Sequence, residues 1–518
     1  MNIKRAKEDI KDTVRLYLKK DAYGEYRIPV VRQRPIFLVG APGIGKTAIM
    51  EQIAQELGIA LVSYSMTHHT RQSALGLPFI SHREYEGMPY EVSEYTMSEI
   101  ISSVYDVMQK SGIKEGILFL DEINCVSETL APSMLQFLQY KVFGRHKVPD
   151  GWVIVTAGNP REYNRSVREF DVVTLDRMKV LQVEADYEAW KAYAGVKGIH
   201  NAIMNYLELK KQDFYVMEMT PGGRSYVTAR GWEDLSQIIQ LYEEEGLSVD
   251  EELVGQYLRH ERVVKEFTAY YDLYCKYQKD YHIEEILSGE AGDAMREKAS
   301  AAPFDERISL LGMLTDKADS EMRDVMEQSD YLASLLQALK VVRSAVEKDA
   351  AQNGLEQKTF YASDGLNLIS IMEKQIEGRK KLIQNLQEAG ALSEADKQMH
   401  RRVIRFLEEG KKDLCLSELS TTAEKFAYLK QKFEEEVAGM KQRTGTVKER
   451  LHHLFTFVEQ TFEDGNEMLL LMTHMTVTET DAAFIARFGC EDYQAHNDEM
   501  MLSERQNTLL SQIQELEL

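Results

Sequence analysis

Eight consecutive residues near the N-terminus have the types and spacing that could hold a chain of phosphate groups. Glycines at the first, fourth and sixth positions allow backbone N–H groups to turn inward around phosphate oxygens. The lysine at the seventh position would reach the β- and γ-phosphates, and the threonine hydroxyl after it would coordinate Mg²⁺. The pattern predicts a phosphate cradle formed by Gly40, Ala41, Pro42, Gly43, Ile44, Gly45, Lys46 and Thr47.

A second chemical feature is the segment 116–122, which reads GILFLDE. If this apolar strand lies beside the cradle, it brings Asp121 to the Mg²⁺ shell. Glu122, one residue further, is suited to orient or deprotonate an attacking water. The alternative is a strand end with two solvated acids. The position of the pair downstream of the cradle favours the catalytic interpretation.

A third feature is Asn159, at the end of the apolar run WVIVTAGNP (152–160). Ligand sites in open parallel sheets lie at the carboxyl ends of the strands. A side-chain amide at that place can hold the attacking water or contact the γ-phosphate. The alternative is that the Asn-Pro pair only begins a turn.

Five short apolar runs, separated by stretches of helical character, must position these residues. Short apolar strands that alternate with helices indicate a parallel sheet with helices on both faces, which is an α/β fold of the P-loop type. The runs are IFLV (36–39), ALVSY (60–64), GILFL (116–120), WVIVTA (152–157) and VLQV (180–183).

The rest of the chain has helical character. Residues 1–34 begin with apolar residues at helical spacing and carry ten Lys and Arg against five Asp and Glu, which predicts a basic amphipathic helix. SVDE at 248–251 matches a capping box, so a long helix is expected after it. All ten prolines lie at or before Pro303, which predicts a boundary near 290–303 and a long α-helical region beyond it.

We therefore predict four consecutive segments: a basic N-terminal helix (1–34), an α/β nucleotide-binding core (35–185), an α-helical lid and extension (186–290), and an α-helical C-terminal domain (291–518). Two apolar stripes in the last segment predict the core of a helical bundle, with a partner-binding coiled coil as the alternative. The stripes are Phe426, Leu429, Phe433, Val437 and Met440, and then Leu451, Leu454, Val458 and Phe462.

Composition limits the classes of function. The 518 residues carry a formal net charge of −22, which argues against a nucleic-acid partner, because phosphate binding needs clustered Lys and Arg. No apolar run approaches the length of a membrane span, and the charged N-terminus lacks the apolar stretch of a secretory signal. The four cysteines form no CxxC pattern, so neither a cysteine zinc site nor a disulfide framework is expected. We expect a cytoplasmic protein without a membrane partner.

The order of the motifs resembles that of AAA+ ATPases: GAPGIGKT, LFLDE, TAGNP, TLDRMKV and then TARGWEDL at 228–235. Two further segments resemble the MoxR branch, whose members combine an insertion in helix 2 with a hairpin before the sensor strand. FISHREYEGMPYEVSEYTMSE (79–99) would supply the insertion, and FGRHKVPDGW (143–152) the hairpin. The resemblance covers about residues 35–270. It implies ATP and Mg²⁺ as ligands, and the absence of an NKxD sequence disfavours guanine.

The resemblance also implies a role for each motif residue. Lys46 and Thr47 hold phosphate and Mg²⁺, Asp121 holds Mg²⁺, and Glu122 is the catalytic base. Asn159 becomes the first sensor of the γ-phosphate.

A second sensor is implied at Arg230, at the start of a lid helix, from where it would reach the γ-phosphate of its own subunit. Arg224, in TPGGRSY, is a rival for this role because two glycines precede it. The alternative for Arg230 is a helix N-terminal arginine that packs on Trp232.

Arg177 lies between two apolar runs in VVTLDRMKV (172–180). In the family's layout, the residue before the last strand enters the nucleotide site of a neighbouring subunit as an arginine finger. The alternative is an ion pair with Asp176 or Asp171. Other arginines on the same stretch compete for the role: Arg161, Arg165 and Arg168.

Three functions follow from these features. The first is a ring-forming, chaperone-like remodelling ATPase of MoxR type. A homo-oligomer, most simply a hexamer, and a protein partner with a von Willebrand factor A domain are implied by the resemblance alone. The second is a nucleic-acid-associated motor, which the acidity disfavours. The third is a scaffold whose assembly ATP controls without a hydrolytic cycle.

Overall fold

The computed structural model describes residues 1–68, 74, 76–164, 167–220, 223–352, 366–417, 419, 421–462 and 465–498. The contacts of the chain divide it into two compact units, each built from segments that are separate in the sequence. Unit 1 comprises residues 1–189, 228–230 and 376–404, and unit 2 comprises residues 190–227, 231–375 and 405–518. The predicted four-segment division remains a prediction.

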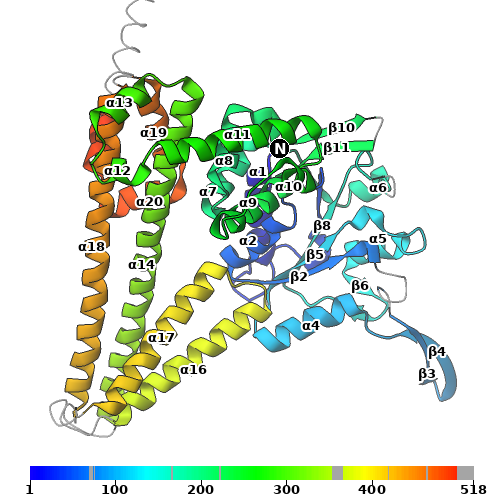
Figure 1. The fold of residues 1–518 in the computed structure, drawn as a ribbon. Helices are drawn as coiled ribbons and strands as arrows, with labels where there is room; N and C mark the ends of the chain where they lie inside the picture. The colour runs from blue at the N-terminus through cyan, green and yellow to red at the C-terminus, as the bar shows by residue number, and fades with distance from the viewer. Residues whose placement is uncertain are drawn as a thin grey trace, which may run out of the picture. The chain divides into compact units, whose positions relative to one another are not determined.

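A five-stranded parallel sheet forms the centre of unit 1, with its strands in the order β2-β5-β8-β1-β9 (Figure 1). Each of the five apolar runs forms one strand, so the predicted α/β fold is confirmed. The strands are β1 (Ile36–Gly40), β2 (Ala60–Ser65), β5 (Gly116–Asp121), β8 (Trp152–Gly158) and β9 (Lys179–Val183).

Helices cover the sheet of unit 1. Apolar residues of α4 and α5 join one core cluster with Leu118 and Leu120 of β5, whose side chains point to the same face. α2 contacts β2 and β5, and α1 contacts α2 and β9. The helices are α1 (Ile3–Leu18), α2 (Ala48–Leu57), α4 (Glu99–Ser111), α5 (Ala131–Tyr140) and α6 (Val172–Leu175).

The predicted basic helix, α1, is amphipathic. Its apolar side is buried at Ala6, Ile10 and Val14. Two of its lysines form ion pairs within unit 1. The ammonium groups of Lys7 and Lys11 lie 2.6 and 2.5 Å from the carboxylate of Glu56 on α2.

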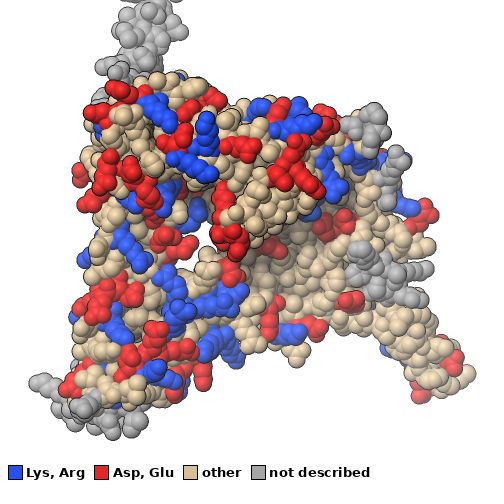
Figure 2. Space-filling model, in the orientation of Figure 1, with Lys and Arg blue, Asp and Glu red and all other residues tan. Residues whose placement is uncertain are grey.

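Two antiparallel hairpins lie where the insertion and the hairpin were expected. β3 (Pro78–Tyr85) pairs with β4 (Met88–Tyr95), and β6 (Val142–Phe143) pairs with β7 (His146–Lys147). The β3–β4 hairpin projects from the core and exposes apolar and acidic side chains (Figures 1 and 2).

A turn from the C-terminal half of the chain completes unit 1. It joins α16 (Leu366–Glu388) to α17 (Glu394–Leu416). Ala389 and Ala391 of this turn are buried in the same core cluster as the sheet. The amide of Leu61 on β2 donates a hydrogen bond of 2.9 Å to the carbonyl of Ala389. Because β2 is an outer strand, the turn covers an edge that would otherwise expose unpaired backbone groups.

Unit 2 is mostly helical, but a hairpin interrupts the segment predicted to be helical throughout. The hairpin pairs β10 (Val216–Thr220) with β11 (Gly223–Val227). The helices between residues 187 and 300 are α7 (Tyr187–Lys197), α8 (Asn201–Leu209), α9 (Ala229–Glu244), α10 (Glu251–Tyr257), α11 (Glu261–Asp280), α12 (Ile283–Leu287) and α13 (Asp293–Ser300).

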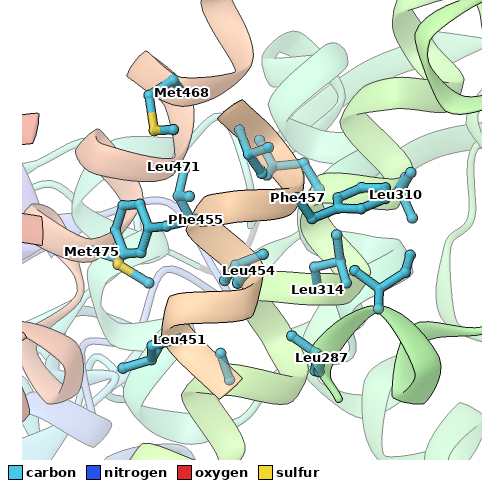
Figure 3. Packing of buried hydrophobic residues seen from close by; sticks show 14 of the residues in the cluster. Leu287, Leu310, Leu314, Leu451, Leu454, Phe455, Phe457, Met468, Leu471 and Met475 are labelled. Carbon is cyan, nitrogen blue, oxygen red and sulfur yellow. The ribbon is translucent and has the colours of Figure 1, made fainter. Parts of the chain in front are cut away.

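Long helices form the rest of unit 2, as expected for the proline-free region. α14 (Phe304–Gln352) and α18 (Thr422–Phe462) pack on α19 (Asn466–Val477), and α14 also packs on α20 (Glu479–Phe488). Figure 3 shows the core at this place, where Leu314 and Leu454 lie among other buried side chains.

The second predicted stripe on α18 is part of this bundle core, since Leu451, Leu454, Val458 and Phe462 are all buried there. In the first stripe only Leu429 is fully buried, and the others are partly exposed. The bundle interpretation therefore holds for the C-terminal half of the helix. None of the described helices combines the length and the apolar character needed to cross a bilayer.

Candidate nucleotide-binding site

The cradle joins the end of β1 to the start of α2, and its backbone has a conformation that glycine adopts readily. Gly43 has φ +75° and Gly45 has φ +92°. A Cβ on Gly43 would lie 2.9 Å from the Cβ of Thr228, so this glycine also lets a second segment approach the cradle. α2 begins at Ala48, directly after the cradle, so the positive end of its dipole adjoins the loop.

The buried ammonium group of Lys46 connects two strand ends. It donates hydrogen bonds to the carbonyl oxygens of Gly40 (2.9 Å) and Ala41 (2.8 Å) and to Oδ1 of Asn159 (2.9 Å). These three bonds use all three ammonium protons. The structure thus brings the cradle and the tip of β8 into direct contact.

The pKa of Lys46 is lowered to about 8. Burial, which disfavours the charged form, is the largest cause. Asp121 raises the pKa, Arg230 lowers it, and Glu122 raises it by a smaller amount. A phosphate chain brought to this lysine would favour its charged form.

Thr47 and Asp121 meet as the sequence predicts. The Thr47 hydroxyl donates a hydrogen bond of 2.9 Å to Oδ2 of Asp121. A hydroxyl and a carboxylate are hard oxygen donors of the kind that Mg²⁺ prefers. The two side chains therefore fit a magnesium site, in which the ion would neutralise phosphate oxygens.

Glu122 has a strained backbone, with φ +55° in the left-handed region that non-glycine residues rarely adopt. Such conformations persist where the surrounding structure enforces them, often at functional sites. Its Oε2 accepts a hydrogen bond of 3.3 Å from the hydroxyl of Ser65, at the end of β2. Ser65 is a site residue that the sequence analysis missed.

Asn159 is held in place by a second missed residue, Asn124. The Asn124 amide donates a hydrogen bond of 2.8 Å to the carbonyl of Asn159. A Cβ on Gly158 would lie 2.5 Å from Oδ1 of Asn124, so only glycine allows this approach. The Asn124 side chain thereby fixes the backbone that presents the Asn159 amide to Lys46.

Arg230 lies beside the cradle. Its backbone amide is 3.4 Å from the carbonyl of Gly43, and residues 228–230 belong to unit 1, whereas α9 continues into unit 2. The positive charge of Arg230 contributes to the lowered pKa of Lys46, after the larger effects of burial and of Asp121. Its rival Arg224 lies on β11, in unit 2, and both arginines are exposed.

Arg177 lies at the opposite end of the sheet. It follows α6 and precedes β9, is exposed, and donates a hydrogen bond of 3.1 Å to the carbonyl of Val173. Lys179, two residues on, pairs with Ile36 at the start of β1, whereas the cradle follows the end of that strand. Four residues of strand span roughly 13 Å.

The competitors of Arg177 differ in their surroundings. Arg168 forms an ion pair of 2.6 Å with Glu128. Arg161 is exposed in a turn after β8. Arg165 lies outside the described residues.

Residues 36–175 match the model of a family described as ATPases associated with various cellular activities, AAA. This segment is an AAA ATPase domain. The matched part of the domain contains the cradle, Asp121, Glu122 and Asn159, and it ends before Arg177. No curated protein is similar enough to the chain to count as a match.

Proposed function

We propose that the protein is a Mg²⁺-dependent ATPase whose hydrolytic site is completed by a neighbouring subunit. The observation that carries this proposal is the contrast between two ends of one sheet. Lys46, Asp121, Asn159 and Arg230 gather at the carboxyl ends of the strands, whereas Arg177 is exposed near their amino ends.

Within one subunit, the side chains divide the chemistry. Lys46 and the cradle amides bind the β- and γ-phosphates, and Thr47 and Asp121 hold Mg²⁺. Glu122 orients the attacking water and accepts its proton. Asn159 and Arg230 contact the γ-phosphate. Most of the rate enhancement of phosphoryl transfer comes from such positioning and from charge neutralisation.

The remaining charge on the γ-phosphoryl group needs a further cation. Arg177 is too far along the strand to serve the cradle of its own chain, but it is exposed and can enter the site of a neighbour. An arginine finger of this kind contributes ~10³- to 10⁵-fold in rate where it has been examined. We propose a closed ring, most simply a hexamer, because head-to-tail contacts that close form rings.

We further propose a MoxR-type remodelling role, supported by the positions of the β3–β4 and β6–β7 hairpins and by the resemblance of the motifs. The client would be a protein, with a von Willebrand factor A domain protein as partner. On the face in Figure 2, Lys and Arg side chains are interspersed with Asp and Glu, and the net charge is −22. Neither feature favours a nucleic-acid motor.

Mixing two inactive variants tests the shared site. Lys46→Ala removes phosphate binding from the subunit that carries it. Arg177→Ala removes the cation that a subunit supplies to the nucleotide site of its neighbour. In a random equal mixture, half times half, or about a quarter, of the interfaces combine an intact cradle with an intact arginine. We expect each variant alone to hydrolyse ATP at background rates and the mixture to regain about a quarter of wild-type activity.

The matched control mixes Lys46→Ala with Asp121→Asn. Both changes affect the cradle side of the interface, so no combination of these subunits builds an intact site, and activity should stay at background. The shared site is contradicted if Arg177→Ala alone hydrolyses ATP at the wild-type rate. It is also contradicted if the first mixture assembles but remains inactive.

A further inference from the structure

Three ionisable side chains from three helices meet inside the bundle of unit 2. They are Asp319 on α14, His474 on α19 and Asp481 on α20, and one potential ligand atom from each lies within 4.8 Å of the others. Nε2 of His474 is 2.8 Å from Oδ2 of Asp319 and 3.7 Å from Oδ2 of Asp481. None of these residues belongs to the nucleotide-binding site of unit 1.

The corner between α19 and α20 brings two of these side chains together. Thr478 ends the first helix and begins the second. His474 lies in the last turn before this corner, and Asp481 lies in the first turn after it. Met475 and Phe484, close to them in sequence, are buried in the bundle core, so the cluster lies at the edge of an apolar environment.

The buried carboxylate of Asp481 lacks the partners that its charge requires. The side chain is 0% exposed, yet neither of its oxygens accepts a hydrogen bond. Oδ1 of Asp319 and Oδ2 of the nearby Asp316 are buried without a hydrogen bond as well. An unpaired buried carboxylate is costly, and proteins compensate for it with a cation, a metal ion or a proton.

The charges at this place do not balance. Asp316, Asp319 and Asp481 contribute three carboxylates, and Arg323 is the cation that acts on two of them. The guanidinium of Arg323 is held elsewhere by a hydrogen bond of 2.8 Å to the carbonyl of Gly195. Burial, which is the largest cause, raises the pKa of Asp316 and of Asp481, so these carboxylates need a neutralising partner, which is either a bound cation or a proton.

We propose that Asp319, His474 and Asp481 bind one divalent transition-metal ion, Zn²⁺ or Mn²⁺, that joins α14 to the α19–α20 corner. One imidazole nitrogen and two carboxylate oxygens suit such ions. Two ligand atoms about 2.0–2.2 Å from one ion can lie up to ~4.4 Å apart, and the separations of 2.8 and 3.7 Å from Nε2 of His474 to the two carboxylate oxygens fall within that reach. The rival explanation is a proton shared between the two aspartates.

The test uses the full chain carrying Asp121→Asn, which removes a Mg²⁺ ligand from the nucleotide site, after treatment with a chelator and without nucleotide. We expect Zn²⁺ or Mn²⁺ to bind with about one ion per chain and to raise Tm with increasing metal concentration. Asp481→Asn and His474→Ala should each weaken metal binding by more than roughly 10- to 100-fold, which is the usual cost of losing a residue that only hydrogen-bonds to a metal ligand. Calorimetric titration and thermal unfolding measure both effects.

Glu479→Gln is the matched control, because Glu479 lies on the same helix as Asp481 but is exposed. It should leave metal affinity unchanged. Two outcomes overturn the proposal. In the first, neither ion stabilises the metal-free chain and Asp481→Asn raises its stability, as expected if the two aspartates share a proton. The other is metal binding that survives both substitutions, which would place the ion elsewhere.

Discussion

At the scale of single residues, Lys46 is the centre of the nucleotide site. Its ammonium bonds to the cradle and to Asn159, so two separate parts of the chain meet at one charge. Burial disfavours the protonated form of the lysine and is the largest cause that lowers its pKa to about 8. The charge state of this lysine should therefore respond to pH and to phosphate within an accessible range.

ATP binding should take up a proton near pH 9. Above pH 8 the ammonium of Lys46 loses its proton in the free protein, and a triphosphate favours its return. Apparent ATP affinity should consequently fall with rising pH above about 8, by at most about tenfold per pH unit. Calorimetry in two buffers of different ionisation enthalpy measures the uptake.

A second lysine provides the control. The pKa of Lys141 is also lowered to about 8 by burial, but its ammonium bonds to Gln33 and to the carbonyl of Trp152 instead of the cradle. Lys141→Met should leave the proton uptake intact. An affinity that stays constant from pH 7 to 9.5 would contradict the role given to Lys46.

The lowered pKa of Lys46 also makes the stability of the fold depend on pH. Between pH 8 and 10.5 the unfolded chain binds more protons at Lys46 than the folded chain does. The contribution of this group to the free energy of unfolding therefore increases with pH across that window.

At the scale of elements, the α16–α17 turn is the unexpected part of unit 1. Ala389 is fully buried, and its carbonyl pairs with the edge strand β2. Gly390 adopts φ +65°, which allows the chain to reverse there. A segment more than 200 residues beyond the sheet in sequence thus forms part of its core.

Ala389→Leu should destabilise the nucleotide-binding unit. The added isopropyl group has no space in this packed core, and such overpacking costs about 1–3 kcal/mol. The measurement is the midpoint of the unfolding transition that ATP shifts, because that transition reports the unit that binds nucleotide.

Ala395→Leu is the matched control, since Ala395 lies on α17 close to the turn and is exposed. This change should leave the midpoint unaltered. Equal midpoints for the two variants would show that the turn contributes nothing to the stability of the core.

At the scale of the whole molecule, the chain passes repeatedly between its two units. Residues 228–230 return to unit 1 before α9 continues in unit 2, and α16 and α17 each contain residues of both units. The covalent chain therefore joins the two units at several places.

The specific ATPase activity should rise steeply with protein concentration. An isolated subunit has no neighbour to supply Arg177, so turnover per subunit follows the fraction of assembled interfaces. Activity measured beside molecular mass over the assembly range tests this relation, and Arg177→Ala should stay low throughout. Constant turnover by a strictly monomeric chain would contradict the shared site.

Local signals in the sequence predicted the sheet correctly. Each of the five apolar runs became a strand, because buried parallel strands need continuous apolar residues. Two local interpretations were wrong. The capping residue at 248–251 is Asp250, not Ser248, and the helix after it is the short α10. Residues 216–220 and 223–227 pair as a hairpin, and these partly exposed strands lack a strong apolar pattern.

The sequence by itself determined the glycine-rich loop after β1, the two carboxylates at the end of β5 and the helical character of the C-terminal region, because glycine conformations, strand burial and helix propensity act over a few residues. Only the tertiary structure decided which distant groups meet. Ser65 reaches Glu122 through strand register, Ala389 covers β2 through packing, and Asp319 on α14 meets the α19–α20 corner through the packing of the bundle. Such contacts depend on the path of the whole chain, which no short stretch of residues encodes.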